Sequence, residues 1–278
     1  MNRVPFSFSR ALLIARNTLR EAMRQRLVHL IVLVAFALVV SAQWLRDFNF
    51  GSSELKFVAD FGFGAIAFFG SALTIAATAQ LFFSEIEQRT VLTLLAKPVW
   101  RAEFILGKFL GVVAVVAAFC VLMTALLAAV LWSRETALMR SFPDAFKHGR
   151  AIDYASLAGA GLAQGLKLVV LAALTLLVAS FAQTQLFTVA SGFLILVVCH
   201  LQYLAQEAAE RGGPAVSRGL AGALALLFPN FQAFDFSEAI GASDGFAWGS
   251  LARLTLYSVG YAAAVCGLAT VSFRRREI

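Results

Sequence analysis

Residues 84–111 read SEIEQRTVLTLLAKPVWRAEFILGKFLG and place a dense group of charges between two long apolar segments. The charged side chains of this stretch are Glu85, Glu87, Arg89, Lys97, Arg101, Glu103 and Lys108. The flanking segments are nearly free of charge, and residues 109–133 carry none. Because a helix without a polar face needs lipid or other helices around it, this pattern predicts a water-facing connection between two membrane spans.

The composition of the whole chain also indicates an integral membrane protein. Of the 278 residues, 60% are hydrophobic and 14% are charged, whereas a soluble domain carries about 45–50% apolar and about 25% charged residues. The net charge of +7 comes largely from arginines beside apolar segments. That placement orients membrane proteins, so we expect no nucleic-acid partner. The three cysteines lie inside apolar runs, which favours buried thiols over disulfides.

We predict an all-α membrane protein with six transmembrane helices in a single domain over residues 1–278. Six apolar segments are long enough to cross a bilayer of about 30 Å: 28–45, 57–83, 104–132, 155–181, 186–204 and 251–273. The basic residues of the amino-terminal segment, of residues 89–108 and of 274–276 then lie on one side, which should be the cytoplasm of a bacterium. Both termini would therefore be cytoplasmic, at the inner membrane. Four basic residues of the third connection oppose this orientation without reversing it: Arg134, Arg140, Lys147 and Arg150.

Two segments do not have the pattern of simple spans. Within residues 1–27, positions 9–27 predict an amphipathic helix on the inner headgroups, with Arg16, Arg20 and Arg24 along one face. The alternative is a flexible basic tail that only sets the topology. Within the fifth connection, residues 205–250, the apolar run 220–228 is too short to span and favours re-entrant or surface helices.

The charged stretch has its own helix signals. Ser84 and Glu87 have the S-x-x-E spacing of a capping box, which predicts that a helix begins at Ser84. Lys97 precedes Pro98, so this helix should stop there and the next should start at Pro98. The expected result is a short coupling helix within residues 84–103, on the membrane surface. The alternative is a tight turn anchored by charges.

The same residues resemble a known family. Glu85 to Thr90, Leu94 to Val99, Arg101 to Phe104 and Gly107-Lys108 are similar to the first cytoplasmic loop of ABC type 2 permeases. The likeness extends to bacterial subunits such as the membrane subunit of the nitrous-oxide-reductase maturation transporter. It covers about thirty residues closely, and the rest of the chain by its layout alone.

The resemblance implies a division of labour. A separate ATP-binding subunit, present in two copies, would hold ATP and Mg and dock on the loop, while two permease copies would pair. This chain would itself hold no cofactor and would not be an enzyme, and it lacks a phosphate-binding G-x-x-x-x-G-K-[ST] motif. The candidate coupling residues are Glu85, Glu87, Arg89, Thr90, Leu94, Leu95, Lys97, Pro98, Arg101 and Glu103.

Other residues suggest helix packing or a polar path. Gly107 and Gly111 have the small-xxx-small spacing that lets helices approach closely. The candidate pathway residues are Thr74, Thr78, Gln80 and Lys167, since polar groups at membrane depth often mark function. Interhelical bonding by the threonines and snorkelling by the lysine are the alternatives. Cys199-His200 alone does not make a metal site, so we expect none.

We therefore predict the permease subunit of an ATP-driven transporter, an exporter. One alternative is a subunit that transmits energy to an extracytoplasmic partner without moving a solute. Another is an ion-coupled carrier, which the scarcity of charge deep in the spans disfavours. The apolar spans do not identify a substrate.

Overall fold

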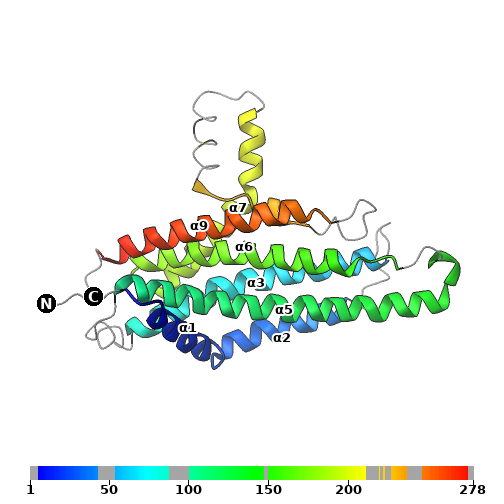
Figure 1. Ribbon diagram of the computed structural model, residues 1–278, viewed down its shortest axis with the longest axis horizontal. Helices are drawn as coiled ribbons and strands as arrows, with labels where there is room; N and C mark the ends of the chain where they lie inside the picture. Colours follow the sequence, from blue (N-terminus) through cyan, green and yellow to red (C-terminus); the bar gives the residue numbers. More distant parts are fainter. Residues whose placement is uncertain are drawn as a thin grey trace.

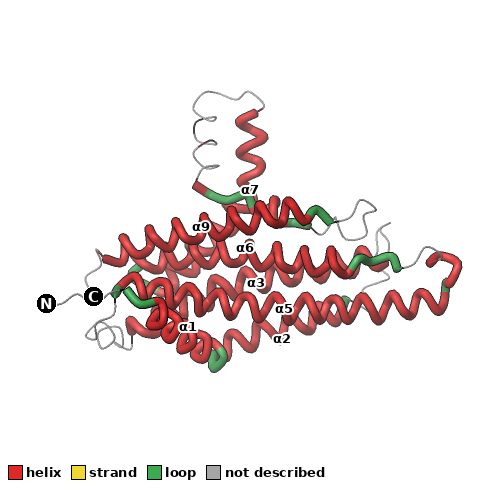
Figure 2. Tube along the Cα trace, in the orientation of Figure 1, coloured by secondary structure: helices red, strands yellow, loops and turns green. Residues whose placement is uncertain are grey.

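The computed structural model describes residues 6–42, 54–87, 100–146, 150–210, 219, 222, 227–236 and 246–274, with the backbone alone at 85–87, 144–145, 205–206, 208–210 and 274. All regular structure in these residues is helical (Figure 2). The helices are α1 (Phe8–Ala22), α2 (Arg26–Ser41), α3 (Glu54–Glu87), α5 (Arg101–Ser141), α6 (Tyr154–Phe181), α7 (Gln185–Glu210) and α9 (Trp248–Arg274), with the 3-10 turns η2 (Pro143–Phe146) and η3 (Phe231–Phe234). The all-α prediction is confirmed.

The long helices form an elongated bundle (Figure 1). Among the described residues, five helices are long and apolar enough to cross a membrane, namely α3, α5, α6, α7 and α9. Helices α1 and α2 together make a sixth candidate, bent by 68° at the break between them. The expected first span, 28–45, is represented by α2, whose 16 residues are fewer than the roughly 20 that a span needs.

Helix α6 lies at the centre of the bundle and packs against α3, α5, α7 and α9. Its buried residues cover most of its circumference, as expected for a central helix, and Leu162 is exposed near its start. Helices α7 and α9 instead expose large apolar side chains, such as Leu186, Leu194 and Leu256. We call the end of the bundle that holds α1 and the last turns of α3 and α9 the α1 end, and the opposite end the far end.

Two expected boundaries differ from the structure. The amphipathic helix predicted over 9–27 ends at Ala22, because the chain turns at residues 23–25 before α2 begins. Helix α5 runs on to Ser141 instead of ending near 132, so Arg134 and Arg140 belong to it and not to the connection. Hydropathy detects where a span leaves hydrocarbon, but a helix continues into water wherever its side chains find partners.

The carboxyl-terminal part of α7 leaves the bundle, and the chain returns to it before α9 (Figure 1). Residues 227–236 contain η3, which packs against α6 and α7. Phe231 and Phe234 of η3 are each 1% exposed, and the Tyr261 hydroxyl of α9 donates to the Leu227 carbonyl at 2.6 Å. The described part of the fifth connection thus re-enters the helix bundle.

Candidate functional site

Aromatic rings join three helices at the α1 end. Phe82 of α3, Phe104 of α5 and Phe273 of α9 are buried and have ring centroids 5.6, 5.8 and 6.0 Å apart. Aromatic pairs at such distances add to the free energy gained from burial. They hold the end of α3 beside the start of α5, so residues 88–99 connect two helices that are already packed together.

The first polar contact of α1 with this end is made by Glu103, in the first turn of α5. Its side chain is completely buried and lies 2.7 Å from the Arg10 guanidinium of α1. It also accepts from the backbone N–H groups of Ser7, at 2.7 Å, and Trp100, at 3.0 Å. Three donors therefore compensate the burial of this carboxylate, and two of them belong to the start of α1.

The second polar contact joins α1 to both α3 and α5. Lys108, which is 1% exposed, donates to the Leu81 carbonyl at 2.7 Å and lies 3.7 Å from the Glu21 carboxylate. The Ser84 hydroxyl donates to the same carboxylate at 2.6 Å. Glu21 of α1 is thus shared by the helix before the connection and the helix after it.

Small residues let α1 approach α5 closely between these two contacts. An added Cβ at Gly107 would lie 2.6 Å from the Ile14 Cβ, and one at Gly111 would lie 2.5 Å from the Thr18 Cβ. The facing side of α1 buries Ala11, Ala15, Thr18 and Ala22. The two glycines predicted for helix packing lie where α5 meets α1.

Arg101 extends the network to α9. It donates to the Phe273 carbonyl at 3.2 Å and stacks over the Phe273 ring at 6.0 Å. A cation beside a late carbonyl of a helix also interacts favourably with the helix dipole. We call this set of polar residues the loop junction: Arg10, Glu21, Ser84, Arg101, Glu103 and Lys108.

Two helix boundaries predicted from the charged stretch are wrong. Ser84 does not begin a helix, because α3 continues without a break to Glu87. Its hydroxyl is used by Glu21, 63 residues away in the chain. Helix α5 begins at Arg101 with Trp100 in extended geometry before it, so Pro98 does not occupy its first position.

The remaining coupling residues are only partly placed. Glu85 and Glu87 are described by their backbone alone. Six others lie outside the described residues: Arg89, Thr90, Leu94, Leu95, Lys97 and Pro98. Their role as a docking surface stays a prediction. Glu103 has no exposed surface, so it holds α1 through Arg10 and does not itself form part of an exposed docking surface.

Sequence reasoning missed Arg10 and Glu21. The sequence did hold a signal for them. Arg10 and Glu21 are eleven residues apart, so they lie on the same flank of an α-helix. That flank is distinct from the face of Arg16 and Arg20. No local pattern identifies Glu103 as the partner of Arg10, because the two residues are 93 positions apart in the chain.

The predicted pathway residues lie in different surroundings. Thr74 and Thr78 are buried and donate to backbone carbonyls one turn earlier, at 2.7 and 2.6 Å. Gln80 is half-buried. Lys167, at the middle of α6, is 5% exposed and lies 5.8 Å from the centroid of the Phe231 ring.

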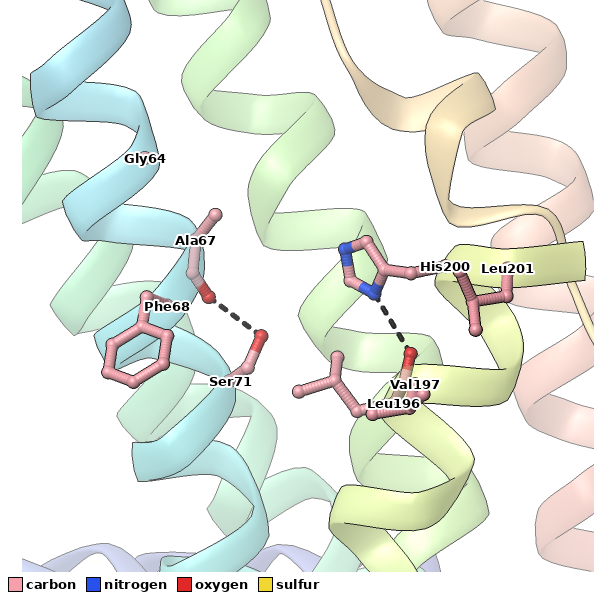
Figure 3. A pocket seen from close by; sticks show the side chains of 8 residues that line it. All are labelled: Gly64, Ala67, Phe68, Ser71, Leu196, Val197, His200 and Leu201. Carbon is pink, nitrogen blue, oxygen red and sulfur yellow. Dashed lines mark hydrogen bonds between the residues drawn. The ribbon is translucent and has the colours of Figure 1, made fainter. Parts of the chain in front are cut away.

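An open cavity of about 370 Å³ lies between α3 and α7 (Figure 3). It is lined by Gly64, Ala67, Phe68, Ser71, Leu196, Val197, His200 and Leu201. Ser71 and His200 are its polar residues, and each bonds to a carbonyl of its own helix, at 2.7 and 2.9 Å. The cavity is therefore mainly apolar and does not involve the predicted pathway residues.

No group of acidic, histidine or cysteine side chains that could hold a metal occurs within the described residues.

The family model described as ABC-2 family transporter protein matches residues 12–278. No curated protein sequence matches the chain. The narrower resemblance to the nitrous-oxide-reductase maturation permease stays a prediction.

Proposed function

Because the chain belongs to the ABC-2 family of transporter membrane proteins, we propose that it is the membrane half of an ATP-driven exporter. It is a multi-pass permease subunit, and this family pairs with ABC ATP-binding subunits. In the proposal, two copies of the permease pair in the bacterial inner membrane and two ATP-binding subunits dock at the α1 end. The α1 end and both termini face the cytoplasm, ATP and Mg bind to the partner, and the permease itself catalyses no reaction.

The loop junction is the observation that carries this proposal. Residues 88–99 connect α3 to α5, and the junction joins those helix ends to α1 and α9. A displacement of the loop would therefore reach four helices at once. This is what a transporter needs if its motor is on another chain, since packed interfaces transmit displacements instead of absorbing them.

The test is the docking of the ATPase. Reversal of Glu87 to Lys should lower the amount of ATP-binding subunit that co-purifies with the permease, and reversal of both Glu87 and Arg89 should lower it further. Reversal of Arg140, an exposed arginine at the far end, is the matched control. If docking and ATPase activity persist after both reversals, the coupling site is elsewhere.

A second candidate function is energy transmission to an extracytoplasmic partner. It is favoured by α5, which extends beyond the other helices at the far end (Figure 1). The extension is held in place by Glu135, which is 1% exposed and accepts from the Tyr154 hydroxyl at 2.8 Å and the Ala151 N–H at 2.8 Å. Solute movement into liposomes by the purified complex would support export, whereas ATP hydrolysis without solute movement supports transmission.

A further inference from the structure

We infer that α1 is a sensor of anionic lipid, whose arginine face binds phospholipid headgroups and passes that binding to the loop junction. The inference adds a regulatory ligand to the proposed function, and its effect on ATP hydrolysis rests on that function. Its two steps, lipid binding and transmission, depend on different residues of α1 and can be tested separately.

The surface of α1 is divided into distinct faces. One face of small residues is buried against α5. The opposite face exposes Arg16 and Arg20, and Arg24 is exposed just beyond the end of the helix. Large exposed apolar side chains adjoin the arginines, with Leu12 at 57% exposure and Met23, just beyond the helix, at 61%. An exposed basic face beside an exposed apolar face is the arrangement of a helix that lies among lipid headgroups.

Charge complementarity identifies the ligand as an anionic headgroup. The sequence of α1 contains one acidic residue, Glu21, and its carboxylate is engaged by Ser84 and Lys108 on another flank. The arginine face therefore presents positive charge without an acidic neighbour from its own helix. Each such arginine near an anionic membrane surface contributes about 1 kcal/mol, or about fivefold in binding.

Transmission follows from the two places where α1 is held. Arg10 and Glu21 are separated by about 16 Å along the helix, at about 1.5 Å per residue. Arg10 bonds to Glu103, just after the loop, while Glu21 bonds to Ser84, just before it. A helix attached at both places cannot shift against the membrane without displacing the loop ends or exposing the buried Glu103 carboxylate. Headgroups that hold α1 in place therefore also hold the two helix ends between which the loop lies.

The first experiment measures lipid binding by the full-length permease in vesicles that contain a photoactivatable phosphatidylglycerol. We expect labelling of α1, and a decrease of about fivefold for each arginine removed in Arg16→Gln and Arg20→Gln. Arg140→Gln is the matched control and should leave labelling unchanged. Equal labelling of α1 in the wild type and the double variant would refute lipid binding by this face.

The second experiment measures transmission with hydrogen exchange over residues 88–99 of the same permease. We expect phosphatidylglycerol to slow exchange there in the wild type and to have no effect in Glu103→Gln, although Glu103→Gln still binds the lipid. Lys108→Met, at the other contact, gives a second variant if Glu103→Gln does not fold. If phosphatidylglycerol slows exchange over residues 88–99 as much in the variant as in the wild type, the lipid signal does not pass through the loop junction.

The third measurement is ATP hydrolysis by the complex with and without phosphatidylglycerol. The lipid should change the rate in the wild type and in Arg140→Gln, but not in the double arginine variant. If the ATPase associates and phosphatidylglycerol changes its rate equally in the wild type, Arg140→Gln and the double arginine variant, the inference is wrong. Failure of the proposed function would look different, because no ATPase would associate with the wild type in any lipid.

Discussion

At the scale of single residues, Glu103 and Lys108 show how burial changes the meaning of a charge. Both belong to the charged stretch that predicts a water-facing surface, and both are buried against α1 or α3. A buried charge is tolerated when several hydrogen bonds compensate its desolvation. The sequence contains these donors and acceptors, but their pairing depends on contacts between distant segments, which no local spacing encodes.

Replacement of Lys108 by Met should destabilise the permease. The change removes a buried hydrogen bond from a charged donor to the Leu81 carbonyl and the cation beside Glu21, and hydrogen bonds of charged groups contribute about 1.5–3 kcal/mol. Thermal unfolding in detergent measures the loss. Arg140→Met, at an exposed position of α5, is the control and should unfold near the wild-type temperature. An unchanged melting temperature for Lys108→Met would mean that this contact contributes nothing to stability.

Replacement of Gly107 by Val should separate α1 from α5. The first added carbon already lies 2.8 Å from the Ala11 carbonyl oxygen, so the backbone must move, at a cost of about 1–3 kcal/mol. Gly260→Val is the matched control, because an added Cβ at Gly260 meets nothing within 4 Å. Limited proteolysis should cut α1 faster in Gly107→Val than in the control. Equal rates would contradict the close approach of the two helices.

At the scale of helices, hydropathy located the long spans but not their ends. The ends depend on individual hydrogen bonds, such as the backward reach of Glu103 to the N–H of Trp100. Apolar composition also could not show that α7 leaves the bundle or that η3 returns to it. The folding of residues 227–236 against α6 and α7 results from the burial of Phe231 and Phe234, which long-range packing decides.

The start of α6 provides a test that depends on pH. The Ser156 hydroxyl and the Ala155 N–H donate to Asp153, and they hold the pKa of this carboxyl below its ordinary value. A lowered pKa means that the cap stabilises the folded state above the ordinary pKa of about 4 and that this contribution is lost as the pH falls through the lower, folded-state value.

Asp153→Ala should therefore cost about 1 kcal/mol at neutral pH, as the loss of a helix cap usually does. The difference from the wild type should shrink as the pH falls below about 4. Unfolding followed at a series of pH values measures it, and Asp153→Asn, which keeps an accepting oxygen, should lose less. A difference that does not vary with pH would exclude the ionised cap.

At the scale of the whole molecule, the proposed orientation can be tested by cysteine labelling. The native Cys120, Cys199 and Cys266 are buried, so they should give little background. A membrane-impermeant maleimide added to intact spheroplasts should label Phe142→Cys, exposed at the far end, but not Met23→Cys, exposed at the α1 end. Disruption of the membrane should make both accessible. The reverse pattern would place the termini outside the cytoplasm.

The length of α5 has a mechanical consequence. One unbroken helix of 41 residues runs from the loop junction to the far end, a distance of about 61 Å at about 1.5 Å per residue. If it pivots as a rigid rod near the α1 end, a tilt of about 5° moves its tip by about 5 Å, roughly the pitch of one helical turn. A rigid α5 that pivots in this way would convert a small tilt at one end of the bundle into a displacement of side-chain size at the other end.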